Sequence, residues 1–152
     1  MLDWQCFFPP ASDESIEAVE QSVAVHLPPR YRSFLITSNG GRPHESVYFT
    51  IPELRERAML GALYGIAVKR GHGLDLETVY ADWRDVLPAG LIPIGEDPGG
   101  NQLLLATVDD GSEGILFWDR VGFLTARTGR NQFHVASNID QFLESLKVMA
   151  DS

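Results

Sequence analysis

The sequence has little of several features that would mark a particular class of protein. It contains one cysteine, Cys6, in 152 residues, and this excludes an internal disulfide framework and a cysteine metal cluster. No apolar run approaches the roughly 20 residues that a membrane helix needs. The first residues lack the basic start and the apolar run of a signal peptide. We therefore expect a cytoplasmic protein that does not contact a membrane.

Positive charge is also scarce, and lysine is nearly absent. Lys and Arg together number 12 against 21 Asp and Glu, which gives a formal net charge of −9. A surface this acidic repels phosphate backbones, so we expect no binding to nucleic acid. The same charge can steer a basic protein partner toward the chain, although solubility alone explains it equally well.

The residue patterns of catalytic and cofactor sites are missing as well. A phosphate-binding loop needs Lys and Ser or Thr after its last glycine, but here Gly100 is followed by Asn101 and Gln102. The turns at residues 97–101 and 109–113 lack the ligand frame of a calcium loop. No two of the four histidines stand at the spacing of metal ligands. We expect no enzyme, no cofactor and no metal.

Helical patterns occupy much of the first half of the chain and its end. Ser12 can cap a first helix, in which apolar residues repeat at helical spacing until the proline pair at 28–29. The patterns predict further helices at 30–38, 52–60, 75–86 and 138–149, with Ser137 as the cap of the last one.

Short apolar runs separated by turn residues dominate the second half. The patterns predict strands at 47–51, 62–68, 91–94, 102–108, 114–118 and 123–126. The last four suit an antiparallel meander of hairpins. Helices first, a sheet next and one closing helix predict an α+β fold. A chain of this length is most often one domain, so we expect a single domain over residues 1–152.

Four motifs in a fixed order carry a family resemblance. They are "LPPRYRSFLITSNGG" (27–41), "LPAGLIPIGEDPGGNQLLL" (87–105), "GILFWDR" (114–120) and "ASNIDQFLESL" (136–146). Together they resemble the SUKH superfamily, which is best known through fungal cell-wall assembly regulators and bacterial immunity proteins. The resemblance covers about residues 12–148. The chain departs from many relatives at one position, where Arg120 replaces a His that follows the Trp-Asp pair.

The resemblance implies an α+β domain with a twisted mixed or mainly antiparallel sheet, N-terminal helices and a closing C-terminal helix. It also implies binding to a protein rather than catalysis. Bacterial members neutralise a toxin by occluding it, often a nuclease with a basic active surface, and the net charge of −9 fits such a partner. The alternative, suggested by the fungal members, is an intracellular regulator or scaffold that recruits client proteins. Neither role indicates an oligomeric state.

Six residues are predicted to contact a partner. They are Glu96, Asp97, Asn101, Trp118, Asp119 and Arg120. Glu96 and Asp97 are expected to lie exposed at the lip of a hairpin turn, as contacts or as solvated acids. Trp118 is more often a core residue than a contact. Asp119 and Arg120 form either a local ion pair or contacts.

Five residues are predicted to have structural roles in turns. Gly99 and Gly100 form the tight turn of that hairpin, which must run at positive φ. Asn39, Gly40 and Gly41 end the second helix as a left-handed cap requires.

Overall fold

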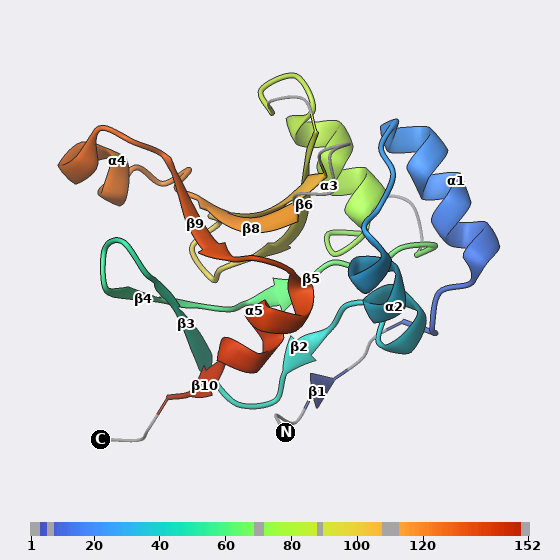
Figure 1. Ribbon diagram of the computed structural model, residues 1–152, viewed down its shortest axis with the longest axis horizontal. Coiled ribbons are helices and arrows are strands. Elements are labelled where there is room, and N and C mark those ends of the chain that lie inside the picture. The colour runs from blue at the N-terminus through green and yellow to red at the C-terminus, as the bar shows by residue number, and fades with distance from the viewer. Residues whose placement is uncertain (1–3, 6–7, 69–71, 88–89, 108–112, 150–152) are drawn as a thin grey trace.

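A computed structural model describes residues 4–5, 8–68, 72–87, 90–107 and 113–149 (Figure 1). The predictions for Cys6 and for the turn at 109–112 lie outside these residues. The helices are α1 (Asp13–Val23), α2 (Pro29–Thr37), α3 (Leu76–Trp83), α4 (Phe123–Thr128) and α5 (Ile139–Ser145). The strands are β1 (Trp4–Gln5), β2 (Arg42–Pro43), β3 (Val47–Ile51), β4 (Glu56–Met59), β5 (Ala62–Leu63), β6 (Leu91–Glu96), β7 (Gln102–Thr107), β8 (Glu113–Trp118), β9 (Gln132–Ala136) and β10 (Lys147–Val148).

The strands form antiparallel sheets, and the α+β fold class is confirmed. The larger sheet has the order β5-β6-β7-β8-β9, so consecutive strands pair as a meander. A second sheet has the order β10-β3-β4, and β1 pairs with β2. The chain passes from one sheet to the other between β4 and β5, where the Gly61 N–H donates to the Glu96 carbonyl at 2.8 Å.

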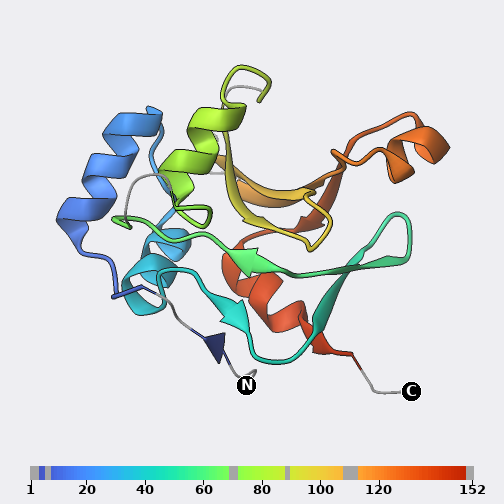
Figure 2. The same cartoon turned by 180° about the vertical axis from the view of Figure 1, so that it is seen from behind.

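The core lies where the two main sheets and α5 meet. Phe142 of α5 packs against Phe49 of β3 with ring centroids 5.3 Å apart, and Phe49 packs against Phe117 of β8 at 6.0 Å. All three side chains are buried. Helix α3 contacts β6 and α1, and α2 contacts α5 (Figures 1 and 2). The β3–β4 hairpin and α4 lie side by side, on the opposite side of the molecule from α1 (Figures 1 and 2).

The predicted helix starts are confirmed where a local side-chain cap decides them. The Ser12 hydroxyl accepts from the Ser15 N–H at 3.1 Å, and the Ser15 hydroxyl accepts in turn from the Ser12 N–H. The Asp75 carboxylate likewise accepts from the Thr78 N–H at 3.0 Å and starts α3. Helix α1 ends before the proline pair, because Ala24 adopts a left-handed conformation with φ of 58°.

The helix predicted at 52–60 is wrong. Residues 52–55 form a turn, and Arg55 has a φ of 54°, which a continuing helix does not allow. The chain then reverses, and β4 pairs with β3 in the register Ile51–Glu56 to Tyr48–Met59. Pairing with a neighbouring strand overrides the local helical pattern. The strand predicted at 62–68 shortens to β5, since Gly65 meets Asp75 only in an isolated bridge and Ala67 has a positive φ.

Two further predictions near the C-terminus are corrected. Residues 123–126 lie in helix α4 rather than a strand, because the Asp119 side chain binds the N–H groups at the start of that helix. The closing helix ends at Ser145, and its cap is Asn138 rather than Ser137. Lys147 and Val148 then form β10 on the edge of β3. No helix among the described residues is long and apolar enough to cross a membrane.

Candidate functional site

The β6–β7 turn is held by one carboxylate. Asp97 Oδ1 accepts from the Gly99 N–H at 2.9 Å and from the Asn101 N–H at 2.8 Å. The Asn101 side-chain amide donates to Asp97 Oδ2 at 2.9 Å. Gly100 has a φ of +94°, which favours glycine, whereas Gly99 lies outside the left-handed region. Asp97 is half-buried, and its carboxylate oxygens accept hydrogen bonds from residues of the turn itself.

Asn101 also joins this turn to a second one, which follows β8. Its Oδ1 accepts from the backbone N–H groups of Arg120 at 2.8 Å and of Val121 at 2.9 Å. Together with the bond to Asp97, one side chain makes three hydrogen bonds to two segments that are distant in sequence. The Gly-Gly-Asn and Trp-Asp motifs are therefore parts of one hydrogen-bonded unit.

Asp119 is buried within that unit and starts α4. One of its oxygens accepts from the Gly122 N–H at 3.1 Å, and the other accepts from the Thr125 N–H and hydroxyl at 2.7 Å each. Burial opposes ionisation of this carboxyl, but the hydrogen bonds from Thr125 and Gly122 outweigh it, and the pKa of Asp119 lies below its usual value. Asp119 thus caps a helix and forms no ion pair with Arg120.

Arg120 instead lies on an aromatic pair formed by Trp83, the last residue of α3, and Trp118, the last residue of β8. Its guanidinium is 3.4 Å from the ring centroid of Trp83 and 5.4 Å from that of Trp118. The two indole rings meet edge to face, with centroids 5.8 Å apart. Trp118 is buried, while Trp83 is half-buried and Arg120 is exposed. An arginine stacked on tryptophan is typical of protein interfaces as well as of stable surfaces.

The prediction that Glu96 and Asp97 lie exposed is wrong, since both are half-buried. Tyr64 donates its hydroxyl to Gln102 Oε1 at 2.6 Å and lies 3.5 Å from Glu96 Oε2. Burial raises the pKa of Glu96, partly offset by the positive charge of Arg42. Burial also raises the pKa of Tyr64.

The Asn39-Gly40-Gly41 turn binds the segments around it. All three residues have positive φ. The Asn39 amide donates to the carbonyls of Pro9 at 2.8 Å and Ile66 at 3.0 Å, and its Oδ1 accepts from the Ile66 N–H at 2.9 Å. A Cβ on Gly40 would lie 2.6 Å from the Tyr64 backbone, so only glycine fits there.

Two hollows flank the β6–β7 turn, and both share Met59, Asp97 and Pro98. The first, of about 520 Å³, extends toward Arg42 and His44. The second, of about 320 Å³, lies between β4 on one side and the turn with α4 on the other. Both are open to solvent, so neither is an enclosed ligand cavity.

Two apolar residues beside the second hollow were missed by the sequence analysis. Phe123 is 78% exposed and Val121 is 50% exposed. Both belong to the segment that Asn101 and Asp119 hold in place. The sequence placed Phe123 in a strand, where alternate residues are buried, so its exposure gave no recognisable signal.

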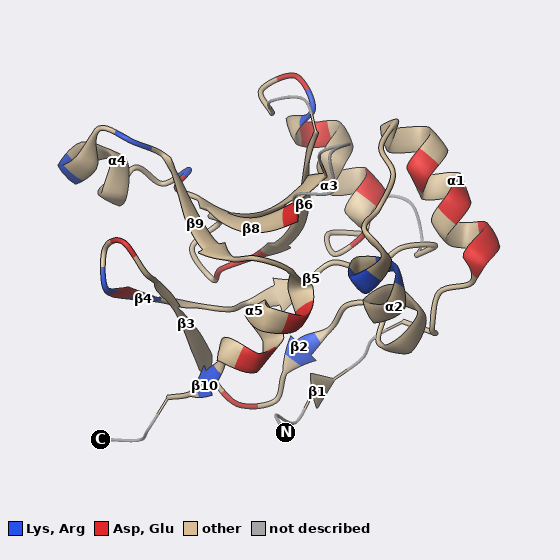
Figure 3. Cartoon of the chain, viewed as in Figure 1, with Lys and Arg blue, Asp and Glu red and all other residues tan. Residues whose placement is uncertain are grey.

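Charge is distributed unevenly over the surface (Figure 3). Residues 13–26, which contain α1, carry four acids and no Lys or Arg. Residues 72–87, which contain α3, carry four acids and one Arg. The two helices pack against each other. Glu14, Glu17, Asp82 and Asp85 are exposed, whereas Asp75 is buried as the cap of α3 and Glu20 pairs with Arg32. We call these four exposed acids, together with Asp13, the acidic face of α1 and α3. The opposite end of the molecule, at α4 and the β3–β4 hairpin, is rich in arginine.

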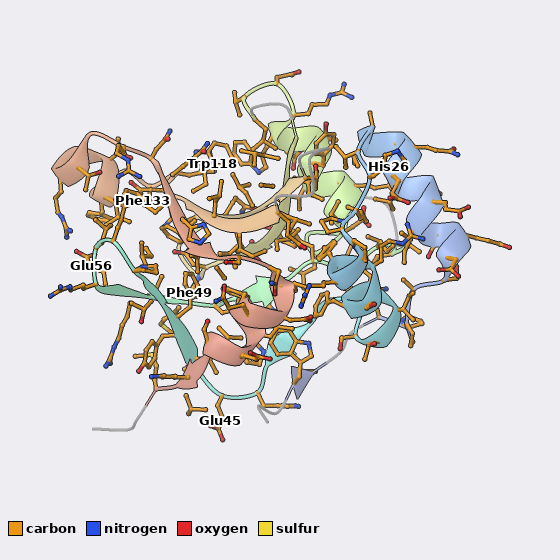
Figure 4. The ribbon with its side chains drawn as sticks, in the orientation of Figure 1. His26, Glu45, Phe49, Glu56, Trp118 and Phe133 are labelled. Atoms are coloured by element: carbon orange, nitrogen blue, oxygen red, sulfur yellow. The ribbon has the colours of Figure 1, made fainter. Side chains whose placement is uncertain are left out.

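Within the described part of the chain, no three His, Cys, Asp or Glu side chains come close enough together to hold a metal ion. The four histidines are dispersed. His26, for example, lies beyond the end of α1 (Figure 4), where its Nδ1 is 3.8 Å from Glu20 Oε2.

Comparison with known proteins identifies one family and no individual relative. Neither the curated proteins nor the solved structures contain a match to this chain. The sequence model of one family matches residues 10–145, which is nearly the whole chain and includes the turns described above. The chain therefore belongs to the SMI1/KNR4 family (SUKH-1).

Proposed function

We propose that this protein is an immunity protein, which binds a cognate toxin and neutralises it by covering its active surface. Membership of the family supports a protein-binding role. The observation that carries the proposal is the acidic face of α1 and α3, defined above. Glu14 and Glu17 on this face are exposed and have no ion-pair partner among the described residues. A toxin that acts on nucleic acid has a basic surface complementary to such a face.

The mechanism is electrostatic steering followed by steric block. Acidic side chains on α1 and α3 raise the rate of encounter with a basic surface, and this effect weakens with salt. Buried anchors then slow dissociation, and aromatic and arginine side chains are the most frequent anchors. Among the six contact residues predicted from sequence, the stacked Arg120 and the half-buried Glu96 remain the candidates for contact with the toxin. Trp118 is buried and lies next to Arg120, which it helps to position. Asp97, Asn101 and Asp119 act through the shape that they give to the turns.

The test is co-expression in a susceptible host. The reading frame next to this gene is expressed with and without this chain, and any complex is isolated by size-exclusion chromatography at low and high salt. We expect toxicity that this chain suppresses, and a one-to-one complex. The double variant Glu14→Lys, Glu17→Lys should weaken rescue, whereas the matched control Glu45→Lys, Glu144→Lys, at exposed acids on other segments, should not. A toxic neighbour that this chain neither binds nor neutralises would refute the proposal.

A regulatory scaffold is the second candidate, and one observation favours it. Beyond the acidic face, the molecule has an arginine-rich end with exposed Val121 and Phe123. Two surfaces of opposite charge suit a protein that recruits more than one client. In that case several partners bind with weaker affinity, and no neighbouring toxin is neutralised.

A further inference from the structure

The starting observation is the free edge of β4. This strand lies at the end of its sheet, since the order is β10-β3-β4. Leu60 N–H donates to the Val47 carbonyl, so hydrogen-bonded pairs alternate along β3 and β4 from that point. By this alternation the N–H and C=O groups of Arg57 and Met59 point away from β3. They have no hydrogen-bond partner among the described residues.

That edge faces the second hollow. Arg57, Ala58 and Met59 line the groove of about 320 Å³ on one side, and Pro98 and Phe123 line it on the other. Phe123 and Met59 are exposed apolar residues, 78% and 36% exposed. The groove thus combines unpaired backbone groups with apolar contacts, which are the two requirements for adding a strand to a sheet edge.

The groove walls are held in place from both sides. Arg127 of α4 forms an ion pair with Glu56 of β4, a residue on the hairpin arm beside α4 (Figure 4). Arg130 donates two hydrogen bonds to Glu53, at 2.6 Å and 2.8 Å. On the far wall, Asn101 and Asp119 fix the backbone that carries Phe123. A segment that enters the groove therefore meets a formed site.

The charges of this end indicate the chemistry of the occupant. Residues 52–59 and 120–130 carry five Arg and two Glu, in a chain whose formal charge is −9. Both Glu residues are engaged by Arg127 and Arg130, and the carboxylates of Asp97 and Asp119 accept hydrogen bonds within their turns. The guanidinium of Arg57 lies 4.3 Å from the Tyr48 ring and has no carboxylate partner among the described residues. These two segments therefore carry a net positive charge.

We propose that the free edge of β4 and the adjoining groove dock an extended, acidic segment of a protein partner. The segment pairs with the outward backbone groups of Arg57 and Met59, places apolar side chains against Phe123 and Met59, and presents carboxylates to Arg57. This surface lies apart from the acidic face of α1 and α3. The proposal therefore goes beyond the proposed function, and its test does not depend on whether a toxin binds the acidic face.

The test begins with a phage library of random peptides selected on the intact chain. We expect enriched peptides in which acidic and apolar residues alternate. A fluorescent synthetic version of the best peptide is then titrated into variants. Arg57→Glu and Phe123→Ala should each weaken binding about tenfold, because interface anchors of these types have effects of that size. The matched controls are Arg84→Glu and Val86→Ala, at exposed residues just beyond α3, and they should bind within about twofold of the original chain.

Two backbone variants distinguish strand pairing from side-chain contact alone. Met59→Pro removes an outward N–H without touching the β3 ladder and should weaken binding more than Met59→Ala. Peptides N-methylated at alternate residues give the same information without altering the fold: one set of positions should abolish binding and the other should not. The proposal would be overturned if the selection gave no peptides or basic ones. It would also be overturned if Arg57→Glu and Phe123→Ala bound the peptide as tightly as the original chain does.

Discussion

Asn101 and Arg120 are joined by a hydrogen bond of 2.8 Å from the backbone N–H of Arg120 to the Asn101 side chain. The same oxygen accepts from Val121, and the amide of Asn101 donates to Asp97. This one side chain fixes two turns relative to each other and thereby sets the position of α4. The asparagine of the glycine-rich motif is thus a structural link between the two turns.

Asn101→Ala should therefore destabilise the fold. Three hydrogen bonds are lost, and with about 1 kcal/mol for each the free energy of unfolding should fall by about 2–3 kcal/mol. Urea unfolding monitored by tryptophan fluorescence measures this change. Asn131→Ala is the matched control, because its exposed side chain makes no hydrogen bond to the described residues, and it should change stability by less than about 0.5 kcal/mol. Equal effects of the two variants would contradict the linking role.

Asp119→Asn should destabilise the protein in a pH-dependent way. The pKa of this carboxyl is lowered in the folded state, so its stabilising contribution is present above the unfolded value of about 3.9 and is lost as the pH falls through the folded value. Unfolding by urea at pH 7 should show a loss of about 1–3 kcal/mol. The difference from the original chain should shrink at about pH 2. A difference that does not change with pH would show that ionisation of Asp119 is not what stabilises α4.

Glu96→Gln should have the opposite sign. Burial raises the pKa of Glu96 in the folded state, so ionisation costs stability once the pH exceeds the unfolded value of about 4.3. The variant should be more stable than the original chain at pH 7, and this gain should vanish below about pH 4. Thermal unfolding across that range measures it, with Glu45→Gln at an exposed position as the control. A loss of stability at pH 7 would mean that attraction to Arg42 outweighs burial.

Gly65→Ala should destabilise the protein by about 1–3 kcal/mol, because an added methyl group meets packed atoms. A Cβ at this position would lie 2.5 Å from Phe8 Cδ2 and 2.7 Å from the Asn39 carbonyl oxygen. Gly73→Ala is the control, since nothing lies within 4 Å of its added Cβ. Thermal unfolding of both variants decides the matter: a Gly65→Ala protein as stable as Gly73→Ala would show that the neighbours move aside without cost.

Much of the fold could be predicted because the deciding interactions are local. Ser12 and Asp75 cap the helices that start beside them, and Pro29 is the first residue of α2. The turn residues of the meander also act within a few residues of where they stand. The errors at 52–60 and 123–126 have a different origin. There, β3 and Asp119 decide the structure, and Asp119 acts on α4 through a turn whose shape depends on Asn101. Contacts of this kind leave no periodic pattern in the sequence.

The candidate site could be predicted from the sequence only in part, for the same reason. Asp97, Asn101 and Asp119 were predicted as partner contacts, and the hydrogen bonds by which they join and shape the two turns could not be predicted from the sequence. Glu96 and Asp97 were predicted to lie exposed but are half-buried, whereas Glu14 and Glu17 of α1 and Asp82 of α3 are exposed acids. The contact role of the six residues remains a prediction.

In the proposed function, a basic toxin binds the acidic face of α1 and α3. Hydrogen–deuterium exchange of the chain alone and in complex with its cognate toxin tests this most directly, since amides in a buried interface exchange more slowly. We predict protection of residues 13–26 and 72–87 in the complex, and little change in β10. Protection confined to other segments, with both helices exchanging as in the free protein, would contradict the account.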